Sequence, residues 1–321
     1  MRTLSFIIPA KNEEEGITET LRAIRAAVPS QRLQEIIVAD NGSADRTGLI
    51  AESHGACVIT SATSTIAALR NAGASKAVGE VLVFLDADVS LDPQWALGLA
   101  RLDRKLEERA DLVSGAWCKV PATDSWIPRL WHEGVAKRGP VRHIGSGHLI
   151  VPRRTFETLG GFDETLRTGE DYDFCERARS AGIPVIALPE LVAIHRGEPQ
   201  TLREFFKREL WHGAGDATDV KRVLRSYVLL MAIGLAGLHA LMILPFFSFG
   251  LVSWWLSLLA GMAIIIGIAA SVVLRWGCSP PKVMAARMAL IYVYLWGRFA
   301  ALALRALHQD GTDSPRRRES S

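Results

Sequence analysis

The first two thirds of the chain alternate short apolar runs with longer stretches of helical periodicity. Five runs have the length and β-branched content of buried strands, and they cover 4–8, 35–40, 56–61, 81–85 and 112–116. Between them, apolar residues recur at helical spacing over about 15–28, 44–54, 64–78 and 93–108. Strands that alternate with helices are typical of a mostly parallel sheet with helices on both faces. The pattern predicts an α/β domain over residues 1–215.

The last third of the chain has a different pattern, with long segments that carry no charge. Residues 227–249 and 251–274 are each uncharged and long enough to cross about 30 Å of hydrocarbon. A short uncharged turn at 245–250 would join them into a transmembrane hairpin over 226–274, preceded by a juxtamembrane linker at 216–225. Basic residues flank the hairpin on both sides, at Lys221, Arg222, Arg225, Arg275, Lys282 and Arg287. The positive-inside rule therefore predicts that both flanks and the N-terminal domain are cytoplasmic.

A third apolar segment, 284–308, carries Arg287, Arg298 and Arg305 on one helical face. Arginine within a bilayer is costly unless its face packs inward, so this helix either spans the membrane or lies in its interface. The polar stretch 309–321 is predicted to be disordered. Residues 201–213 form a basic amphipathic pattern, which fits either a helix on the anionic leaflet or an ordinary surface helix.

Composition agrees with this division. The chain has 321 residues with 49% hydrophobic residues and a net charge of only +3. That charge is too small to indicate nucleic-acid binding, and no basic patch is interleaved with aromatic residues. The four cysteines lack metal-ligand spacing and are predicted to be reduced in a cytoplasmic environment.

Two carboxylates, Asp86 and Asp88, directly follow the apolar run 81–85. Ligands bind at the carboxyl ends of parallel strands, and a divalent cation relieves the repulsion of two close carboxylates. Mg²⁺ or Mn²⁺ would complete its shell with substrate phosphates; the alternative is an ordinary acidic turn. Polar clusters at 9–14 and 40–45 follow two other strands, although Asn41 and Ser43 also suit a turn and a helix cap. The absence of a Gly-x-Gly-x-x-Gly fingerprint argues against a dinucleotide-dependent dehydrogenase.

Seven motifs occur in order along residues 3–215. They are SFIIPAKNEE (5–14), IIVADNGS (36–43), RNAG (70–73), FLDAD (84–88), GSGH (145–148), GGFDE (160–164) and GEDYD (169–173). With these motifs the sequence resembles family 2 glycosyltransferases of the GT-A fold. The resemblance implies a Rossmann-like, mostly parallel sheet, a nucleotide-diphospho-sugar donor and an Mg²⁺ or Mn²⁺ cofactor.

The resemblance also implies roles for single residues. The predicted contacts to the nucleotide-sugar are made by Pro9, Ala10, Glu13, Asp40, Arg70, Asp86 and Ala87. Within this set, Asp40 would hydrogen-bond the base and Arg70 would lie near the diphosphate. Asp88 would bind the metal. Lys11 stands where many relatives carry an aromatic residue, which leaves base stacking open.

The pair Glu170 and Asp171 is the second chemical signal. An inverting transfer needs a base for the acceptor hydroxyl, and a positioned, partly desolvated carboxylate can serve. The resemblance assigns this role to Asp171, with Glu170 and His148 on the acceptor side; the alternative is an acidic helix N-terminus. His195 follows a predicted strand and would complete the metal shell, or else pack as an ordinary histidine.

These features predict an inverting, metal-dependent glycosyltransferase, multi-pass in the inner membrane with a cytoplasmic catalytic domain. Its acceptor would be a lipid, lipid-linked or membrane-delivered molecule. Two alternatives are a non-catalytic membrane scaffold of the same fold and a sugar nucleotidyltransferase. The intact carboxylate set argues against the scaffold. The absence of a Gly-rich triphosphate loop near the first strand argues against the nucleotidyltransferase.

Overall fold

The structure of the protein is a computed structural model that describes residues 2–63, 65–121, 125–134, 138–216, 223–224, 226–243 and 251–309. The chain divides into two compact units. The sheet unit comprises residues 1–124 and 134–198, and the helical unit comprises residues 125–133 and 199–321. The boundary thus falls at residue 198 rather than near 215. Parts of the predicted linker, the hairpin turn and the predicted disordered tail lie outside the described residues.

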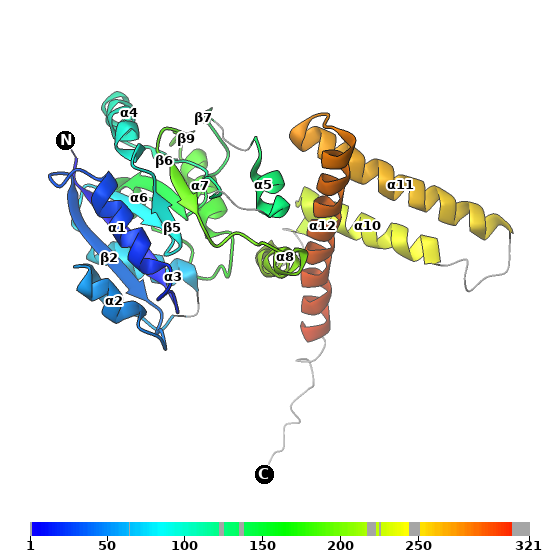
Figure 1. Cartoon of the computed structure of the whole chain (residues 1–321), viewed down its shortest axis with the longest axis horizontal. Coiled ribbons are helices and arrows are strands. Elements are labelled where there is room, and N and C mark those ends of the chain that lie inside the picture. The colour runs from blue at the N-terminus through cyan, green and yellow to red at the C-terminus, as the bar shows by residue number, and fades with distance from the viewer. Residues whose placement is uncertain are drawn as a thin grey trace, which may run out of the picture. The chain divides into compact units, whose positions relative to one another are not determined.

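The sheet unit is built on one mixed sheet with the strand order β3-β2-β1-β4-β8-β6-β9-β7 (Figure 1). The four strands β3, β2, β1 and β4 run parallel, as the sequence predicts, whereas β8 enters antiparallel between β4 and β6. A separate antiparallel pair joins β5 and β10. The strands are β1 (Leu4–Ala10), β2 (Leu33–Asp40), β3 (Cys57–Thr60), β4 (Val81–Leu85), β5 (Val89–Leu91), β6 (Val113–Gly115), β7 (Gly139–Pro140), β8 (His148–Pro152), β9 (Val185–Ala187) and β10 (Ala193–His195).

Helices cover both faces of this sheet. Because successive strand residues point to opposite faces, Phe6 and Ile8 pack in one core with residues of α1 and α4, whereas Ile7 packs in the other with residues of α3, α6 and α7. Burial on both faces is the reason that the central strands are continuously apolar. The helices are α1 (Ile17–Ala27), α2 (Thr47–Ser53), α3 (Ile66–Lys76), α4 (Trp95–Glu108), α6 (Arg153–Thr158) and α7 (Glu170–Ser180).

In the described part of the chain, the helices of this unit pack around an apolar core of their own. They are α5 (Trp126–His132), α8 (Leu202–Asp216), α10 (Tyr227–Ile243), α11 (Leu251–Trp276) and α12 (Pro281–Gln309). Two of them, α11 over Trp254–Trp276 and α12 over Pro281–Leu307, are long and apolar enough to cross a membrane. The predicted first span corresponds to α10, which has 17 residues within the described part of the chain and falls short of the about 20 that a span needs.

Helix α12 extends through the whole segment whose arginines argued against spanning. Arg287 pairs with Glu133 at 2.7 Å, and Arg298 pairs with Glu209 at 3.0 Å. Because a carboxylate neutralises each of these arginines, their presence does not by itself exclude α12 from a bilayer.

Helix α8 packs on α12 rather than standing free as a leaflet-bound helix. A Cβ at Gly297 would lie 2.8 Å from the Glu209 side chain, and a Cβ at Gly213 would lie 2.8 Å from Ala301. These distances are too short for real Cβ atoms, so the two glycines permit the close approach of the helices. Phe205 of α8 is fully buried in the same core.

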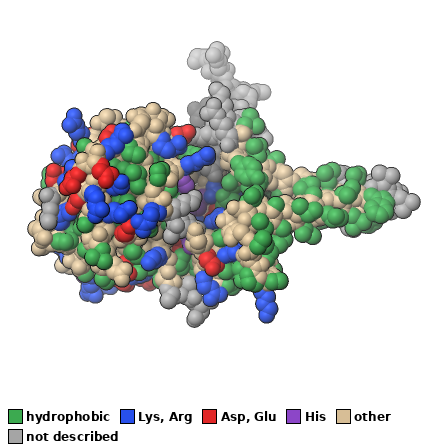
Figure 2. Space-filling model, turned by 90° about the horizontal axis from the view of Figure 1, so that it is seen from above, with side chains coloured by type: hydrophobic (Ala, Val, Ile, Leu, Met, Phe, Trp, Pro, Cys, Tyr) green, Lys and Arg blue, Asp and Glu red, His purple; other side chains and the backbone are tan. Residues whose placement is uncertain are grey.

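Helix α11 exposes large apolar side chains. Trp255 is 67% exposed, and Ile265 and Leu259 are each 60% exposed. Figure 2 shows hydrophobic side chains over much of the visible surface of the helical unit. Soluble monomers rarely leave contiguous apolar surfaces of this kind in water, which indicates that a lipid or protein surface covers α11.

Candidate functional site

The three acidic strand ends meet at one edge of the sheet, as the sequence predicts. Strands β1 and β2 are parallel with Ala10 opposite Asp40, and β1 and β4 are parallel with Ile7 opposite Phe84. The chain therefore leaves β1, β2 and β4 at the same edge, and Asp40 and Asp86 lie at or just beyond their strand ends. This is the edge at which open α/β sheets bind ligands.

The loops after β1 and β2 are joined by hydrogen bonds. The Asn12 amide donates to Ser43 Oγ at 2.9 Å, and the Ala44 amide donates to Asn12 Oδ1 at 2.8 Å. Asn12 adopts φ 56°, a left-handed conformation that asparagine tolerates better than most residues. The Ser43 hydroxyl in turn donates to the buried carboxylate of Asp40. These contacts fix the strand ends that carry the predicted nucleoside contacts.

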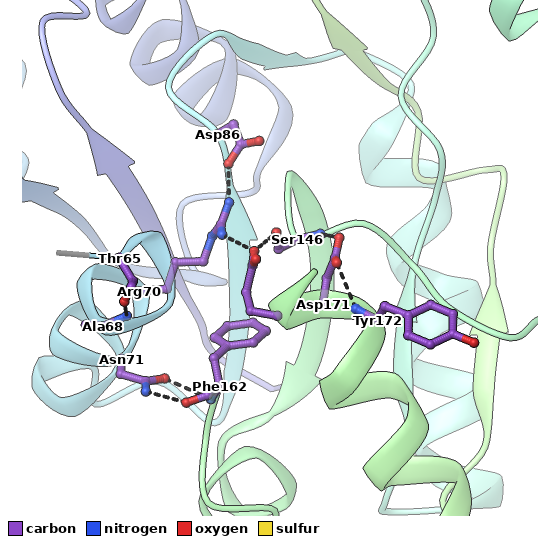
Figure 3. Close-up of polar contacts among 10 residues, drawn as sticks. Thr65, Ala68, Arg70, Asn71, Asp86, Ser146, Phe162, Asp171 and Tyr172 are labelled. Atoms are coloured by element: carbon purple, nitrogen blue, oxygen red, sulfur yellow. Dashed lines mark hydrogen bonds and ion pairs between the residues drawn. The ribbon is translucent and has the colours of Figure 1, made fainter. Parts of the chain in front are cut away.

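Arg70, which the resemblance places near the diphosphate, lies buried between two carboxylates. Its Nη2 contacts Asp86 Oδ1 at 2.6 Å, and its Nη1 contacts Glu170 Oε1 at 2.6 Å (Figure 3). Arg70 is 2% exposed. A buried guanidinium needs such partners, and each terminal nitrogen of Arg70 contacts one carboxylate. Arg70 therefore positions Asp86 and Glu170, and its predicted place near the donor diphosphate stays a prediction.

Glu170, which the resemblance places on the acceptor side, is likewise buried. It is 4% exposed and accepts hydrogen bonds from Arg70 and, at 2.9 Å, from the Ser146 hydroxyl. Burial raises the pKa of Glu170 more than the charge of Arg70 lowers it. Its place at the start of α7 depends on Gly169, whose φ of 78° is left-handed and favours glycine.

Asp171 follows in the first turn of α7 and is held by the backbone (Figure 3). The Ser146 amide donates to Asp171 Oδ2 at 3.1 Å, and the Tyr172 amide donates to Oδ1 at 2.7 Å. Burial raises the pKa of this carboxyl group, and the charge of Asp86 adds to the increase. A carboxylate that is positioned, desolvated and more basic than usual has the properties of a general base.

Asp173, two residues after Asp171, makes a structural contact. It pairs with Arg177 at 2.8 Å, and Arg177 also donates to the carbonyl oxygen of Gly161. The side chain thus fastens α7 to the preceding loop, away from the Ser146 contact of Asp171.

Asp88 lies beside His195, although 107 positions separate them in the sequence. Strand β10 pairs with β5 so that His195 is opposite Val89, the residue after Asp88. His195 Nε2 is 3.1 Å from Asp88 Oδ2, and His195 Nδ1 is 2.8 Å from Glu198 Oε1. Burial lowers the pKa of His195, but hydrogen bonds to Asp88 and Glu198 outweigh this effect and raise it to about 10.

Once a cation displaces the proton of Nε2, the Asp88 carboxylate and the His195 imidazole are donors of the kinds that a divalent cation binds. Two neighbouring ligands of an octahedral ion at about 2.1 Å lie about 3 Å apart, close to the observed Nε2–Oδ2 distance. Burial raises the pKa of Glu13, and the charges of Asp88 and Asp86 raise it further, so the strand ends share a negative field. Among the described residues, no group of three or more His, Cys, Asp or Glu side chains is placed to hold a metal.

Two predicted site residues are buried. His148 is 1% exposed; Trp95 Nε1 donates to its Nε2 at 2.9 Å, and its Nδ1 is 3.3 Å from the Ala116 oxygen. Burial lowers the pKa of His148 to about 4, which favours the neutral imidazole. Ala87 is 4% exposed, and its carbonyl oxygen accepts a hydrogen bond from Thr20. The acceptor contact of His148 and the donor contact of Ala87 stay predictions.

Sequence reasoning missed two polar residues of the site. Ser146 was visible only as part of a glycine-rich motif, and its contacts to Glu170 and Asp171 depend on folding. Glu198 follows His195 by three positions, and a carboxylate that close to a candidate metal-binding histidine was the signal that could have identified it.

Comparison with known proteins places this geometry in a family. The sequence profile of glycosyl transferase family 2 matches residues 5–162. An uncharacterized glycosyltransferase of Mycobacterium tuberculosis, Rv0539, is 31% identical over 191 residues, which cover 58% of this chain and 83% of that protein. The chain belongs to glycosyl transferase family 2. It is a glycosyltransferase, and a nucleotide-sugar is its class of donor.

Two further similarities bear on the fold and the acceptor. An undecaprenyl-phosphate 4-deoxy-4-formamido-L-arabinose transferase of Pseudomonas fluorescens is 28% identical over 197 residues, 57% of this chain and 53% of that protein. The mannosyltransferase PcManGT of Pyrobaculum calidifontis, solved with GDP-Man and Mn²⁺, aligns with a TM-score of 0.56 at 18% identity, over 98% of this chain and 88% of that one. The latter similarity supports the GT-A fold of the sheet unit.

Proposed function

We propose that the protein is an inverting, metal-dependent glycosyltransferase that transfers a sugar from a nucleotide-diphospho-sugar to a lipid-linked or membrane-delivered acceptor. The observation that carries the proposal is the pair of sites at and beside the carboxyl edge of the sheet. One is Asp88 with His195, and the other is Asp171 held by Ser146. Arg70 lies between the two chain segments that carry these sites, because it contacts Asp86, two residues before Asp88, and Glu170, the residue before Asp171.

In the proposed reaction the acceptor hydroxyl oxygen attacks the anomeric carbon of the donor sugar. The bond between that carbon and the diphosphate oxygen breaks on the opposite face, and the nucleoside diphosphate leaves with the bonding electrons. Asp171 accepts the proton of the hydroxyl. Its raised pKa favours this transfer, and Ser146 keeps Oδ2 in place.

A divalent cation fits the donor set of Asp88 and His195, with the donor diphosphate and water as its remaining ligands. When bound, it would neutralise negative charge on the leaving diphosphate. Asp40, Ser43 and Asn12 contribute to donor binding, because their hydrogen bonds hold the loops on which the predicted nucleoside contacts lie.

A lipid-linked acceptor is supported by the apolar surface of α11 and by the relative named for undecaprenyl phosphate. A helical unit that lies in a membrane would keep the sheet unit near lipid-carried hydroxyl or phosphate groups.

A release assay tests the proposal. Purified full-length protein is offered separate UDP-, GDP- and dTDP-sugars with Mn²⁺ or Mg²⁺, in detergent with and without polyprenyl phosphate. We expect release of nucleoside diphosphate from one donor class, increased by the lipid, and none from Asp171→Asn under the same conditions. A protein that binds nucleotide-sugars but releases no diphosphate with any lipid fraction would instead be a scaffold.

The orientation of the membrane unit gives a separate prediction. The prediction takes the transmembrane hairpin from the sequence, in which residues 227–249 are uncharged and long enough to span, although the described α10 has 17 residues. Basic residues precede α10 and follow α11, so the sheet unit is expected in the cytoplasm. Alkaline phosphatase inserted at position 248, between α10 and α11, should be active, whereas the same reporter fused at the N-terminus should be inactive. The reverse pattern, or cleavage of the sheet unit by protease added to intact cells, would contradict this orientation.

A further inference from the structure

The buried carboxylate of Glu198 lies directly behind the candidate metal-binding histidine. Glu198 is 7% exposed, and its Oε1 is 2.8 Å from His195 Nδ1. Carboxylates almost never occur fully buried without a partner. The imidazole is one partner of this buried carboxylate, and the contact fixes which ring nitrogen faces Asp88.

The backbone around these residues brings the three side chains together. The Arg196 amide donates to the Asp88 carbonyl oxygen at 3.1 Å, which continues the pairing of β10 with β5. At Gly197 a Cβ would lie only 2.0 Å from Asp88 Oδ2. A side chain at position 197 would therefore have to displace the Asp88 carboxylate. The passage of the chain beside Asp88 places Glu198 on the far side of the imidazole ring.

We infer that Glu198 is a positioning residue, which holds His195 so that Nε2 and Asp88 Oδ2 together bind the divalent cation. The inference rests on the proposed metal site of the glycosyltransferase and adds a residue to it. Histidines that bind metals commonly donate their second ring N–H to a carboxylate, which orients the ring and strengthens its ligand nitrogen. Here Nδ1 is directed to Glu198 and Nε2 to Asp88.

A purely structural role for Glu198 makes a different prediction. In that case removing Glu198 would lower the stability of the loop. Any effect on metal affinity would then be the same whether or not His195 is present. If Glu198 acts through the imidazole, its loss should have no further effect once the imidazole has been removed. A double-mutant cycle separates the two roles.

The experiment measures Mn²⁺ binding to the full-length, metal-free protein by the electron paramagnetic resonance signal of free Mn²⁺, without donor or acceptor. Removing a carboxylate that hydrogen-bonds a metal-binding histidine typically weakens metal binding by about 10–100-fold. We expect a loss of this size for Glu198→Ala. Glu198→Gln should have a smaller effect, because its amide oxygen can still accept from Nδ1–H. The double variant His195→Ala/Glu198→Ala should bind no more weakly than His195→Ala, within about twofold.

Asp111→Asn is the matched control, since Asp111 is a carboxylate that pairs with Arg109 on the exposed surface, and it should leave Mn²⁺ affinity unchanged. If Glu198→Ala does not fold, the same cycle is run with Glu198→Gln. Wild-type Mn²⁺ affinity in both Glu198 variants would overturn the positioning role. So would a double variant that binds Mn²⁺ more weakly than His195→Ala by the same factor that Glu198→Ala shows alone. If the parent protein binds no Mn²⁺, the metal site of the proposed function fails, and this inference with it.

Discussion

Replacing Asp171 by Asn is expected to lower kcat by about 10² to 10⁴, the usual contribution of a general base, while the affinity for nucleotide-sugar changes little. Asparagine keeps the size of the side chain and can still accept from the Ser146 amide, but it cannot take the acceptor proton. The measurement compares steady-state turnover with donor binding measured in the absence of acceptor. Asp173→Asn is the control, because Asp173 pairs with Arg177 and should retain most of the activity.

The pH dependence provides a second measurement of the same role. Because burial raises the pKa of Asp171, the base loses its charge at a pH above the ordinary range of aspartate. The rate of the parent protein should therefore fall as the pH is lowered through that raised pKa. This acid limb should be absent from the residual activity of Asp171→Asn. Normal turnover of the variant, or donor binding weakened as severely as turnover, would place the base elsewhere.

Much of the sheet unit follows from local sequence. The runs predicted at 81–85 and 35–40 correspond to β4 and β2, because strands buried on both faces are continuously apolar. The antiparallel entry of β8 between β4 and β6 could not be predicted in this way. That arrangement depends on pairing with Val81–Leu85, which lies more than sixty positions earlier in the chain, and no local pattern specifies it.

In the candidate site, too, local features could be predicted from the sequence and long-range contacts could not. Carboxylates that end strands, such as Asp86 and Asp88, were recognisable because strand ends are local features. Arg70 was assigned to the diphosphate from its motif, but its partners Asp86 and Glu170 stand 16 and 100 positions away. The burial of His148 could not be predicted either, because only the fold shows that Trp95 Nε1 donates to it in the core. Residue type indicates possible chemistry, whereas burial and long-range partners decide whether the chemistry is used.

Replacing Asp88 by Asn is expected to affect donor binding as well as turnover, in contrast to Asp171→Asn. A bound cation would connect Asp88 to the diphosphate and stabilise charge on it by several kcal/mol. Since each 1.36 kcal/mol is a factor of ten, turnover should fall about 10²-fold or more. The Asp88 side chain is 29% exposed, so the fold should survive the change, and thermal unfolding of the variant can verify this.

Chelation separates the metal role of Asp88 from a direct contact with the donor. EDTA should abolish turnover by the parent protein, and added Mn²⁺ should restore it. Asp88→Asn should show the same weak donor binding with and without EDTA, because the ligand that holds the cation is already missing. This non-additivity distinguishes the two roles, because a carboxylate that contacted the sugar directly would add its own loss of donor affinity to the loss caused by chelation. A variant that is fully active in EDTA would exclude both the metal role and the assignment of Asp88.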